Sequence, residues 1–398
     1  MFIDTKEGRR PRVTSAWGRG ALALATVGVL SLSACSASGD DTGADGPINI
    51  GMIIPLTGPV PQPTYVKAAE LRINEINADG GIDGRNVELS VYDMGADPNS
   101  AVNATNKAIA DGVDIAIGVP WTSAAKAVRP VLERAGLPLL YMANTAELSK
   151  DVFDSDNYFA LQAPSSALGA ADAEFVKEVL KAENPALTST TDEGSQVVIG
   201  KVREAITEAG LQIQSDQKVA PTVTDMTPQV LNLKGADVIV TNNTPAVDTI
   251  LIRNARQNGV DVPIILSTAG PEQVANNLTP ADQLRDVYYP GVCAADIPLE
   301  HNTVEESKPY LTAWAAEYGD LKQGTFAAMS YDAVGIAAEA FAKVGTGNSE
   351  ALINYLTNAV DFVGACGAYK SDPTTNILAL PENVFIVSIE NGQLKAVD

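Results

Sequence analysis

The feature that most constrains the fold is a regular alternation of apolar, strand-like runs with amphipathic, helix-like runs, which begins at Ile48. The run 65–78 shows the helical pattern, because Val66, Ala69 and Ile73 fall on one face of a helix. Strands that alternate with helices of this length pair in parallel through right-handed crossovers, so the sequence predicts a doubly wound α/β sheet. In the first half the expected strands are 48–56, 87–93, 114–118 and 138–142, and the expected helices are 65–78, 100–110 and 123–134.

The alternation restarts after an irregular stretch around residues 154–166, which predicts a second α/β unit of similar size. The expected helices are 171–181, 197–209, 227–233 and 246–258, and the expected strands are 186–190, 212–218, 237–241, 262–266 and 287–294. Toward the C-terminus the pattern loosens, with helices expected at 304–318, 325–344 and 349–358 and a strand at 383–389. We therefore expect two parallel-sheet lobes.

The first 34 residues are expected to be a signal peptide. Basic residues precede an apolar run at 21–34, which is shorter than the roughly 20 residues that a membrane-spanning helix needs. Cys35 follows in the sequence Leu-Ser-Ala-Cys, which resembles the lipobox of bacterial lipoproteins, where the cysteine is lipidated. We expect a flexible linker at 35–47 and a protein anchored by lipid to the extracytoplasmic face of the cell membrane; the alternative is a chance cysteine behind an ordinary signal peptide.

The charge of the chain excludes one large class of partners. Its formal net charge is −22 at pH 7, and the basic N-terminal segment makes the remainder more acidic still. A strongly acidic protein repels phosphate backbones, so nucleic acid is not expected as a partner.

The reactive side chains argue against an enzyme. His301 is the only histidine and lies in a polar segment, so we expect it at the surface rather than in a catalytic pair. The sequence has no metal-ligand spacing of Cys and His and no phosphate-binding glycine loop, so neither a metal nor a cofactor is expected. In an exported protein, Cys293 and Cys366 favour a disulfide; the alternative is two buried free thiols.

Several motifs resemble one family of binding proteins. The segments 51–59 (GMIIPLTGP), 73–85 (INEINADGGIDGR), 135–138 (AGLP) and 331–334 (YDAV) are similar to those of the leucine/isoleucine/valine-binding proteins of ABC importers. That resemblance implies the type I periplasmic-binding fold, in which two lobes are joined by a multi-crossing hinge and close on a small ligand. It also implies a monomer that works with separate permease and ATPase subunits.

The lobes are expected to exchange chain segments at the hinge. We expect the first lobe to comprise 48–162 and 296–375, and the second lobe to comprise 163–295 and 376–398.

A docking point for a ligand carboxylate is expected where strands of the first lobe lead into helices. Thr122 and Ser123 follow the strand 114–118, and free backbone N–H groups at a helix N-terminus favour an anion. The alternative role for these two hydroxyls is helix capping. The resemblance adds Thr145 for the carboxylate and the Ala143 carbonyl for the ligand's amino group.

The other half of the site is a carboxylate for the ligand's ammonium. Gly270-Pro271-Glu272 resembles the family's Gly-Pro-Glu segment, which implies that Glu272 pairs with the amino group. An uncharged ligand would leave that acid unpaired, which gives selectivity. The alternative is that Pro271 and Glu272 simply form an ordinary first helical turn.

Several positions depart from the family pattern. The aromatic residue expected in the first lobe falls on Pro63, with Tyr65 nearby, and two second-lobe aromatic positions fall near Glu193 and Asn243. Trp121 stands beside the carboxylate loop, where it either forms a wall of the site or packs between loops. These changes put a branched aliphatic ligand in doubt and favour a polar or second cationic ligand group near Glu193.

We therefore expect a solute-binding protein of an ABC importer that binds an amino acid or a similar metabolite. The alternatives are a carboxylate or amide ligand without an ammonium, such as an aromatic acid, an amide or a urea-like solute, and a sensory module for a signalling partner.

Overall fold

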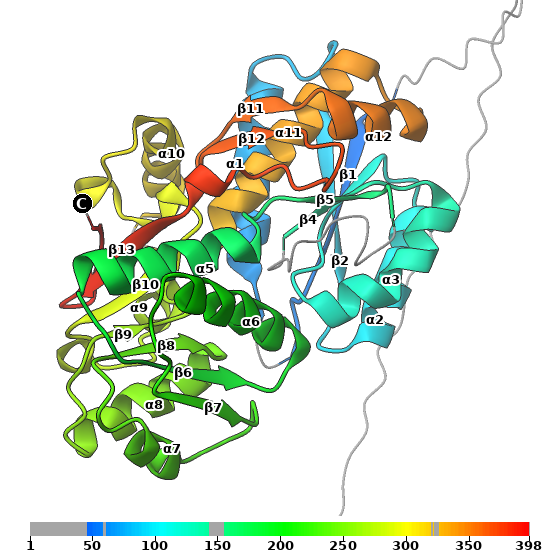
Figure 1. Ribbon diagram of the computed structural model, residues 1–398. Helices are drawn as coiled ribbons and strands as arrows, with labels where there is room; N and C mark the ends of the chain where they lie inside the picture. Colours follow the sequence, from blue (N-terminus) through cyan, green and yellow to red (C-terminus); the bar gives the residue numbers. More distant parts are fainter. Residues whose placement is uncertain (1–45, 59–60, 143–154, 320, 322–325, 398) are drawn as a thin grey trace, which may run out of the picture. The chain divides into compact units, whose positions relative to one another are not determined.

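The computed structural model describes residues 46–58, 61–142, 155–319, 321 and 326–397. The expected signal peptide, Cys35 and nearly all of the expected linker lie outside these residues, as do Ala143 and Thr145. Figure 1 shows the arrangement of the two lobes, which agrees with the fold class predicted from the sequence. Within the described part of the chain, no helix is both long and apolar enough to cross a membrane.

The first sheet has five parallel strands in the order β2-β1-β3-β4-β5. Its strands are β1 (Ile48–Ile54), β2 (Val87–Asp93), β3 (Ile115–Gly118), β4 (Leu139–Tyr141) and β5 (Tyr158–Ala160). The helices α1 (Pro63–Ala78), α2 (Pro98–Ala110) and α3 (Thr122–Ala135) each follow one of the first three strands. Residues of β1 face two separate cores, since Ile50 and Met52 belong to one and Ile53 to the other, which is the pattern of a parallel sheet covered on both sides.

The second sheet has seven strands in the order β14-β13-β10-β9-β8-β6-β7. Five of them are parallel: β6 (Pro185–Thr190), β7 (Ser215–Val219), β8 (Val238–Asn242), β9 (Ile264–Ile265) and β10 (Val287–Gly291). The C-terminal β13 (Phe385–Glu390) and β14 (Gln393–Ala396) run antiparallel at one edge. The second lobe is therefore not a purely parallel sheet, because Asn391 and Gly392, both at positive φ, turn the chain back as a tight hairpin.

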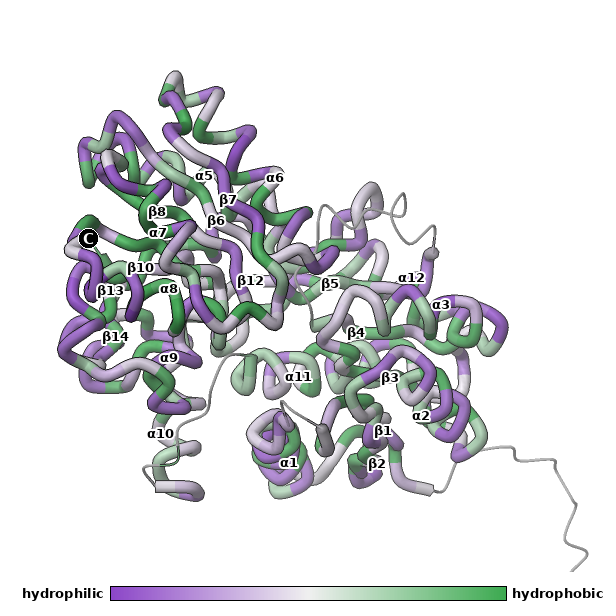
Figure 2. Tube along the Cα trace, turned by 90° about the horizontal axis from the view of Figure 1, so that it is seen from below, coloured by the Kyte–Doolittle hydropathy of each residue, from purple (hydrophilic) through white to green (hydrophobic). Residues whose placement is uncertain are grey.

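The helices of the second lobe cover both faces of this sheet (Figure 1). They are α5 (Ser165–Glu174), continued by a π-helical turn at Phe175–Val179, and α6 (Glu193–Glu208), α7 (Thr227–Asn232), α8 (Pro245–Gln257) and α9 (Pro271–Ala275). Hydrophobic and hydrophilic residues alternate along the helical stretches of the tube in Figure 2, as amphipathic helices require.

The remaining elements follow β10. They are the helices α10 (Lys308–Tyr318), α11 (Ala327–Val344) and α12 (Ser349–Asn358), and the hairpin of β11 (Asp361–Val363) and β12 (Ala368–Lys370). Short 3-10 helices lie at Ala281–Gln283, Ala294–Asp296 (η3), Leu299–His301, Glu305–Ser307 and Pro381–Asn383.

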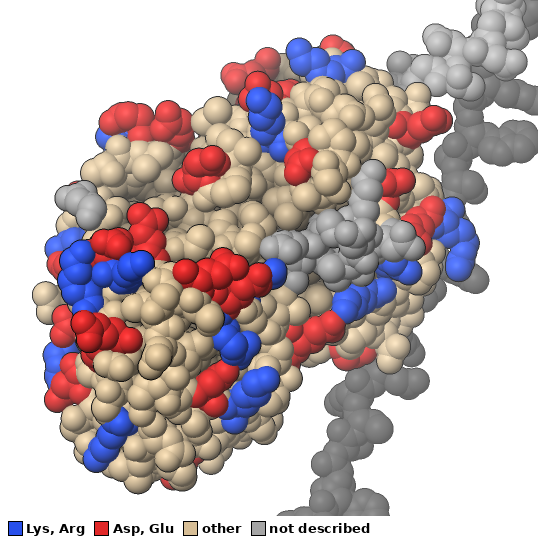
Figure 3. Space-filling view, viewed as in Figure 1, with Lys and Arg blue, Asp and Glu red and all other residues tan. Residues whose placement is uncertain are grey.

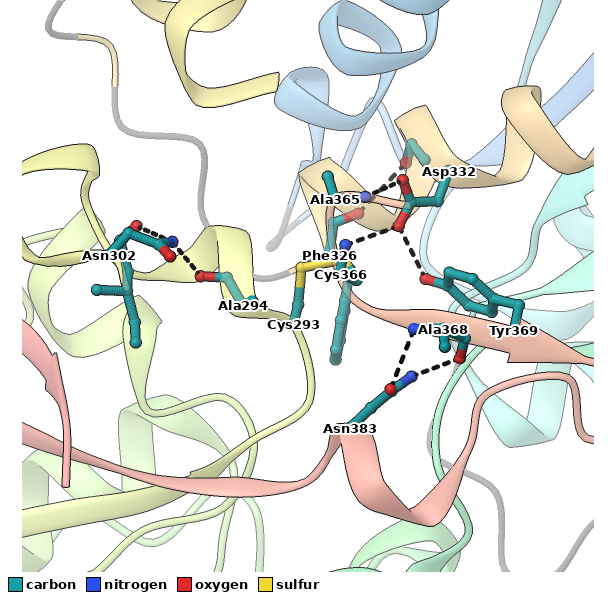
Figure 4. The surroundings of a disulfide bond; sticks show 12 residues. Cys293, Ala294, Asn302, Phe326, Asp332, Ala365, Cys366, Ala368, Tyr369 and Asn383 are labelled. Carbon is teal, nitrogen blue, oxygen red and sulfur yellow. Dashed lines mark hydrogen bonds between the residues drawn. A yellow bond between two sulfur atoms is a disulfide. The ribbon is translucent and has the colours of Figure 1, made fainter. Parts of the chain in front are cut away.

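Segments far apart in sequence are joined where the chain passes between the sheets. The Ala160 N–H donates to the Asn376 carbonyl at 2.9 Å, and the Leu378 N–H donates to the Ala160 carbonyl at 2.8 Å. Cys293, just before η3, forms a disulfide with Cys366, 73 residues later (Figure 4). The lobe boundaries near residues 162, 295 and 375 remain a proposal, which the membership of the two sheets supports.

The loop that carries Cys366 is held by a buried aspartate of the 331–334 motif. Asp332 accepts hydrogen bonds from the N–H groups of Ala365 at 2.7 Å and Cys366 at 2.8 Å, and from the Tyr369 hydroxyl at 3.0 Å (Figure 4). Burial nonetheless raises the pKa of Asp332 to about 6. A side chain at Gly364 would place its Cβ 2.4 Å from the Asp332 Cγ, so only glycine allows this close approach.

Acidic side chains are spread over the surface. On the face shown in Figure 3, Asp and Glu lie interspersed with Lys and Arg. Charges of both signs on the surface, with a net charge of −22 for the chain, favour solubility.

Candidate ligand-binding site

The junction between β3 and α3 is a strained turn that only certain residues allow. Gly118 has φ 117°, and a Cβ there would lie 2.4 Å from the Ile53 carbonyl oxygen. The next residue, Val119, also has positive φ, at 52°, which is costly for a β-branched side chain. Such strain concentrates at functional sites, and here it sets the direction in which α3 begins.

The N-terminus of α3 is not capped by a side chain. Its N-cap residue is Trp121, which makes no capping hydrogen bond, and Thr122 is the first helical residue. Capping, the alternative role for Thr122 and Ser123, is therefore not their role here. Trp121 is half-buried and packs against the core of the first lobe, while Ser123 is exposed. The uncapped first turn leaves its N–H groups available to an anion.

Thr122 faces the second lobe. A Cβ placed on Gly194, in the first turn of α6, would lie 3.7 Å from the Thr122 Oγ1. Thr122 also affects Tyr141 at the end of β4: burial raises the pKa of Tyr141, the Thr122 hydroxyl lowers it, and the charge of Glu193 raises it. Side chains from both lobes therefore meet at the N-terminus of α3.

Glu193, expected near the ligand, is engaged by a lysine. Its carboxylate forms an ion pair with Lys126, one turn along α3 from Thr122. Both side chains are about half exposed, at 51% and 40%. The contact joins α3 to α6 at the surface, and an exposed pair of this kind contributes at most about 1 kcal/mol.

Asn243 is buried, and its amide holds a neighbouring acid. Its Nδ2 donates to the Asp248 Oδ1 at 3.0 Å, and the Thr241 hydroxyl donates to the same oxygen at 2.9 Å. Burial raises the pKa of Asp248 to about 7 despite these two bonds. The side chain of Asn243 thus supports the first turn of α8.

Glu272 lies in α9 and is buried, with only 8% of its surface exposed. Its Oε2 accepts a hydrogen bond from the Asn276 amide. Across from it, Tyr65 of α1 is 2% exposed, and burial followed by the charges of Glu272 and Asp296 raises the pKa of Tyr65. An acid of the second lobe therefore lies close to an aromatic side chain of the first.

Asp296, at the end of η3, was missed by sequence reasoning. Only 7% of it is exposed, and neither carboxyl oxygen has a hydrogen-bond partner within the described ranges. Burial and the charge of Glu272 raise the pKa of Asp296 to about 8. The available signal was an isolated aspartate within the apolar run 292–297 (VCAADI), directly after a strand.

Among the described residues, no group of three or more His, Cys, Asp or Glu side chains is placed to hold a metal ion. The one histidine, His301, is half-buried, and its Nε2 lies 3.2 Å from the Gln393 Oε1.

Comparisons with known proteins agree on the family. The profile of the periplasmic binding protein family matches residues 47–393. The leucine-, isoleucine-, valine-, threonine-, and alanine-binding protein of Pseudomonas aeruginosa is 25% identical over 312 residues, which cover 76% of this chain and 80% of that protein. The Leu/Ile/Val-binding protein of Escherichia coli K12 is 24% identical over 293 residues, or 72% of this chain and 77% of that protein.

Solved structures show the same fold. LivJ of Streptococcus pneumoniae, a branched-chain amino acid transporter substrate binding protein in complex with isoleucine, matches with a TM-score of 0.77 at 24% identity, over 88% of this chain and 99% of that one. A substrate-binding protein of Desulfitobacterium hafniense in complex with Leu matches with a TM-score of 0.75 at 20% identity, over 88% and 99% of the two chains. The chain belongs to the periplasmic binding protein family and has the type I fold of its leucine/isoleucine/valine-binding members.

Proposed function

We propose that this protein is the extracytoplasmic solute-binding component of an ABC importer and binds an amino acid or an amino-acid-like metabolite between its lobes. The observation that carries the proposal is the pairing of opposite charges: the uncapped N-terminus of α3 in the first lobe and the buried Glu272 in the second. An amino acid has the matching zwitterion. The names of the relatives, which bind leucine, isoleucine and valine, support the same class of ligand.

The carboxylate of the ligand would lie at the first turn of α3. Backbone N–H groups at a helix N-terminus and the Thr122 hydroxyl are donors, and neither needs a counter-ion. Ser123, Thr145 and the Ala143 carbonyl complete this half of the site in the proposal. The donors are fixed by the fold, so little ordering is needed when the ligand binds.

The ammonium of the ligand would lie at Glu272. A buried carboxylate is strongly stabilised by a cation and is left unpaired by an uncharged analogue, so the acid selects for the amino group. Tyr65, on the opposite lobe, would add an aromatic ring near the same ammonium. The pair forms only when both lobes contact the ligand, which couples binding to hinge closure.

Delivery of the ligand to the importer would depend on the N-terminal region of the protein. Lipidation at Cys35 would keep the protein, as a monomer, on the outer side of the cell membrane, and the linker 35–47 would let it reach separate permease and ATPase subunits.

Calorimetry and thermal unfolding of the purified chain with a panel of amino acids, amides and aromatic acids test the proposal. A ligand at 100 times its Kd stabilises the folded protein by about 2.7 kcal/mol. Glu272→Gln should weaken amino-acid binding by about 2 kcal/mol or more, roughly thirty-fold, because the ammonium loses its buried partner. Thr122→Val should weaken binding about tenfold by removing one hydrogen bond to a charged group.

Two exposed positions provide matched controls. Glu208→Gln, on the solvent side of α6, and Thr312→Val, on α10, should leave the affinity unchanged. Full binding by Glu272→Gln would instead favour a ligand without an ammonium. Stabilisation by uncharged sugars alone would contradict the carboxylate site. A sensory role would be indicated if the protein co-purifies with a signalling receptor rather than with a permease.

A further inference from the structure

The chain carries a second buried acid at the proposed ammonium site, and its backbone is rigidly held. Asp296 ends η3, the short helix that follows Cys293 and its disulfide. The Asn302 Nδ2 donates to the carbonyls of Ala294 at 2.7 Å and Ile297 at 3.1 Å, so the residues on either side are fixed. The carboxyl group of Asp296, in contrast, has no hydrogen-bond partner in the part of the chain that the structure describes.

A second buried polar group, whose pKa the charge of Asp296 also raises, has no hydrogen-bond partner among the described residues. The Tyr289 hydroxyl, on β10, is fully buried and makes no hydrogen bond. The ring of Tyr289 lies directly under the start of α9, because a Cβ on Gly270 would be 2.5 Å from its Cγ. Tyr289 therefore packs against the start of the helix that carries Glu272, and burial, then the charge of Asp296, raises the pKa of Tyr289.

The groups that face Asp296 are acidic or aromatic. Glu272 of α9 is the charged group whose proximity shifts its pKa, and the charge of Asp296 in turn raises the pKa of four buried tyrosines. These are Tyr65 of α1, Tyr289 of β10, Tyr310 of α10 and Tyr369 of β12. The pKa of Asp296 is raised by burial and by the charge of Glu272, and among the described residues no salt bridge to Asp296 is formed.

A buried carboxyl without a hydrogen-bond partner is costly to the fold, and a second acid close by adds to the cost. One ammonium, at Glu272, would compensate one acid and leave Asp296 unpaired. A second positive charge would compensate both. Tyrosine faces around the acids would stabilise such a cation further.

We propose that the ligand is a dibasic amino acid, with its α-ammonium at Glu272 and its second cationic group at Asp296 and the Tyr289 hydroxyl. This inference rests on the proposed function, since it assigns the side-chain end of the same ligand. It places the second cationic group at Asp296 rather than near Glu193, which Lys126 already engages.

Calorimetric titration of the purified chain with L-lysine, L-ornithine, L-arginine and L-norleucine is the test. Norleucine is the matched probe, because it has the length of lysine without the second charge. At least one dibasic ligand should bind about tenfold or more tightly than norleucine. In Asp296→Asn this advantage should vanish, while the affinity for norleucine changes less than about threefold.

Asp172→Asn is the control for the loss of a buried acid. Asp172 lies in α5, is 2% exposed, and has a pKa raised by burial alone. Its replacement should leave the preference for dibasic ligands intact.

A second measurement does not depend on any variant. Burial and the charge of Glu272 raise the pKa of Asp296 to about 8, so without a ligand its carboxyl should hold a proton at pH 7. A dibasic ligand should displace about one proton at that pH, seen as a dependence of the binding enthalpy on the ionisation enthalpy of the buffer, and norleucine should displace almost none.

The outcomes separate the two proposals. If norleucine binds as tightly as every dibasic ligand, or if Asp296→Asn weakens both classes equally, the dibasic assignment is wrong while the amino-acid site stands. If neither class binds, the proposed function itself fails. If Asp296→Asn does not fold, the absence of proton release from the wild-type protein decides against the assignment.

Discussion

Reduction of the Cys293–Cys366 disulfide should destabilise the protein by an amount that follows from its place in the chain. The bridge closes a loop across 73 residues of sequence. The loss of loop-closure entropy in the unfolded chain then corresponds to about 4.5 kcal/mol at 25 °C. A folded unit that spans residues 44–398 has a large entropy of unfolding, so this free energy corresponds to a decrease in Tm of roughly 6 °C.

The assay is thermal unfolding with and without a reductant, with thiol titration to establish that the bridge is open. A variant with both Cys293→Ser and Cys366→Ser should show the lowered Tm in both conditions and no response to reductant. Ligand binding should weaken as well, because Cys293 adjoins η3, which carries Asp296. An unchanged Tm after complete reduction would refute the reasoning, since it would mean that the bridge does not restrict the unfolded chain.

Two further predictions concern the buried acids. Gly364→Ala should lower the stability by about 2 kcal/mol, because the new Cβ would lie 2.4 Å from the Asp332 Cγ. Gly200→Ala is the control: a Cβ there would meet no described atom within 4 Å, so this variant should be neutral or stabilising in the same unfolding assay. The free energy of unfolding should fall as the pH rises from 5 to 7. The pKa of Asp248 is raised to about 7 in the folded protein, so the folded chain binds more protons in this range than the unfolded chain does. The slope is up to about 1.4 kcal/mol per pH unit. Asp248→Asn should make this pH dependence of the unfolding free energy shallower, and an unchanged slope would contradict the assignment.

Hydrophobic periodicity predicted the exact bounds of two elements. The strand expected at 87–93 and the helix expected at 349–358 have these bounds in the structure. The helix expected at 171–181 begins instead at Ser165, because its first turns consist of small residues that show no hydrophobic period. These small residues allow a close approach to α6: a Cβ on Gly169 would lie 2.7 Å from the Lys201 carbonyl. Local patterns do not reveal such packing between helices.

The short strands β5 and β14 were not predicted for a related reason. Strand β5 has three residues in a stretch that seemed irregular, and it forms because β4 and the Asn376 carbonyl offer it backbone partners. Of the hairpin β13–β14, only the first strand was predicted. Asn391-Gly392 is a strong turn signal from which the second strand could also have been predicted.

The site was predictable where backbone geometry determines it and less so where it depends on which side chains meet. A helix N-terminus after a parallel strand can be expected from the order of elements, and Thr122 lies there. Glu193 and Asn243 were chosen by sequence position alone, and the structure gives them the partners Lys126 and Asp248. Asp296 was missed because its unpaired state depends on residues distant in sequence.

The distribution of these groups between the lobes determines what closure requires. Glu272 lies in α9 and Tyr65 in α1, and in the proposed function their approach on closure would bury carboxyl groups in an apolar surrounding. Without a cation, closure must neutralise the acids by protonation or bear the cost of their desolvation. A cationic ligand would remove that cost, and its higher affinity for the closed arrangement would then shift the hinge equilibrium toward closure. An amino acid with a neutral side chain would compensate Glu272 through its α-ammonium but not Asp296. The proposed preference for a second positive charge therefore has the same electrostatic cause as the proposed coupling of binding to closure.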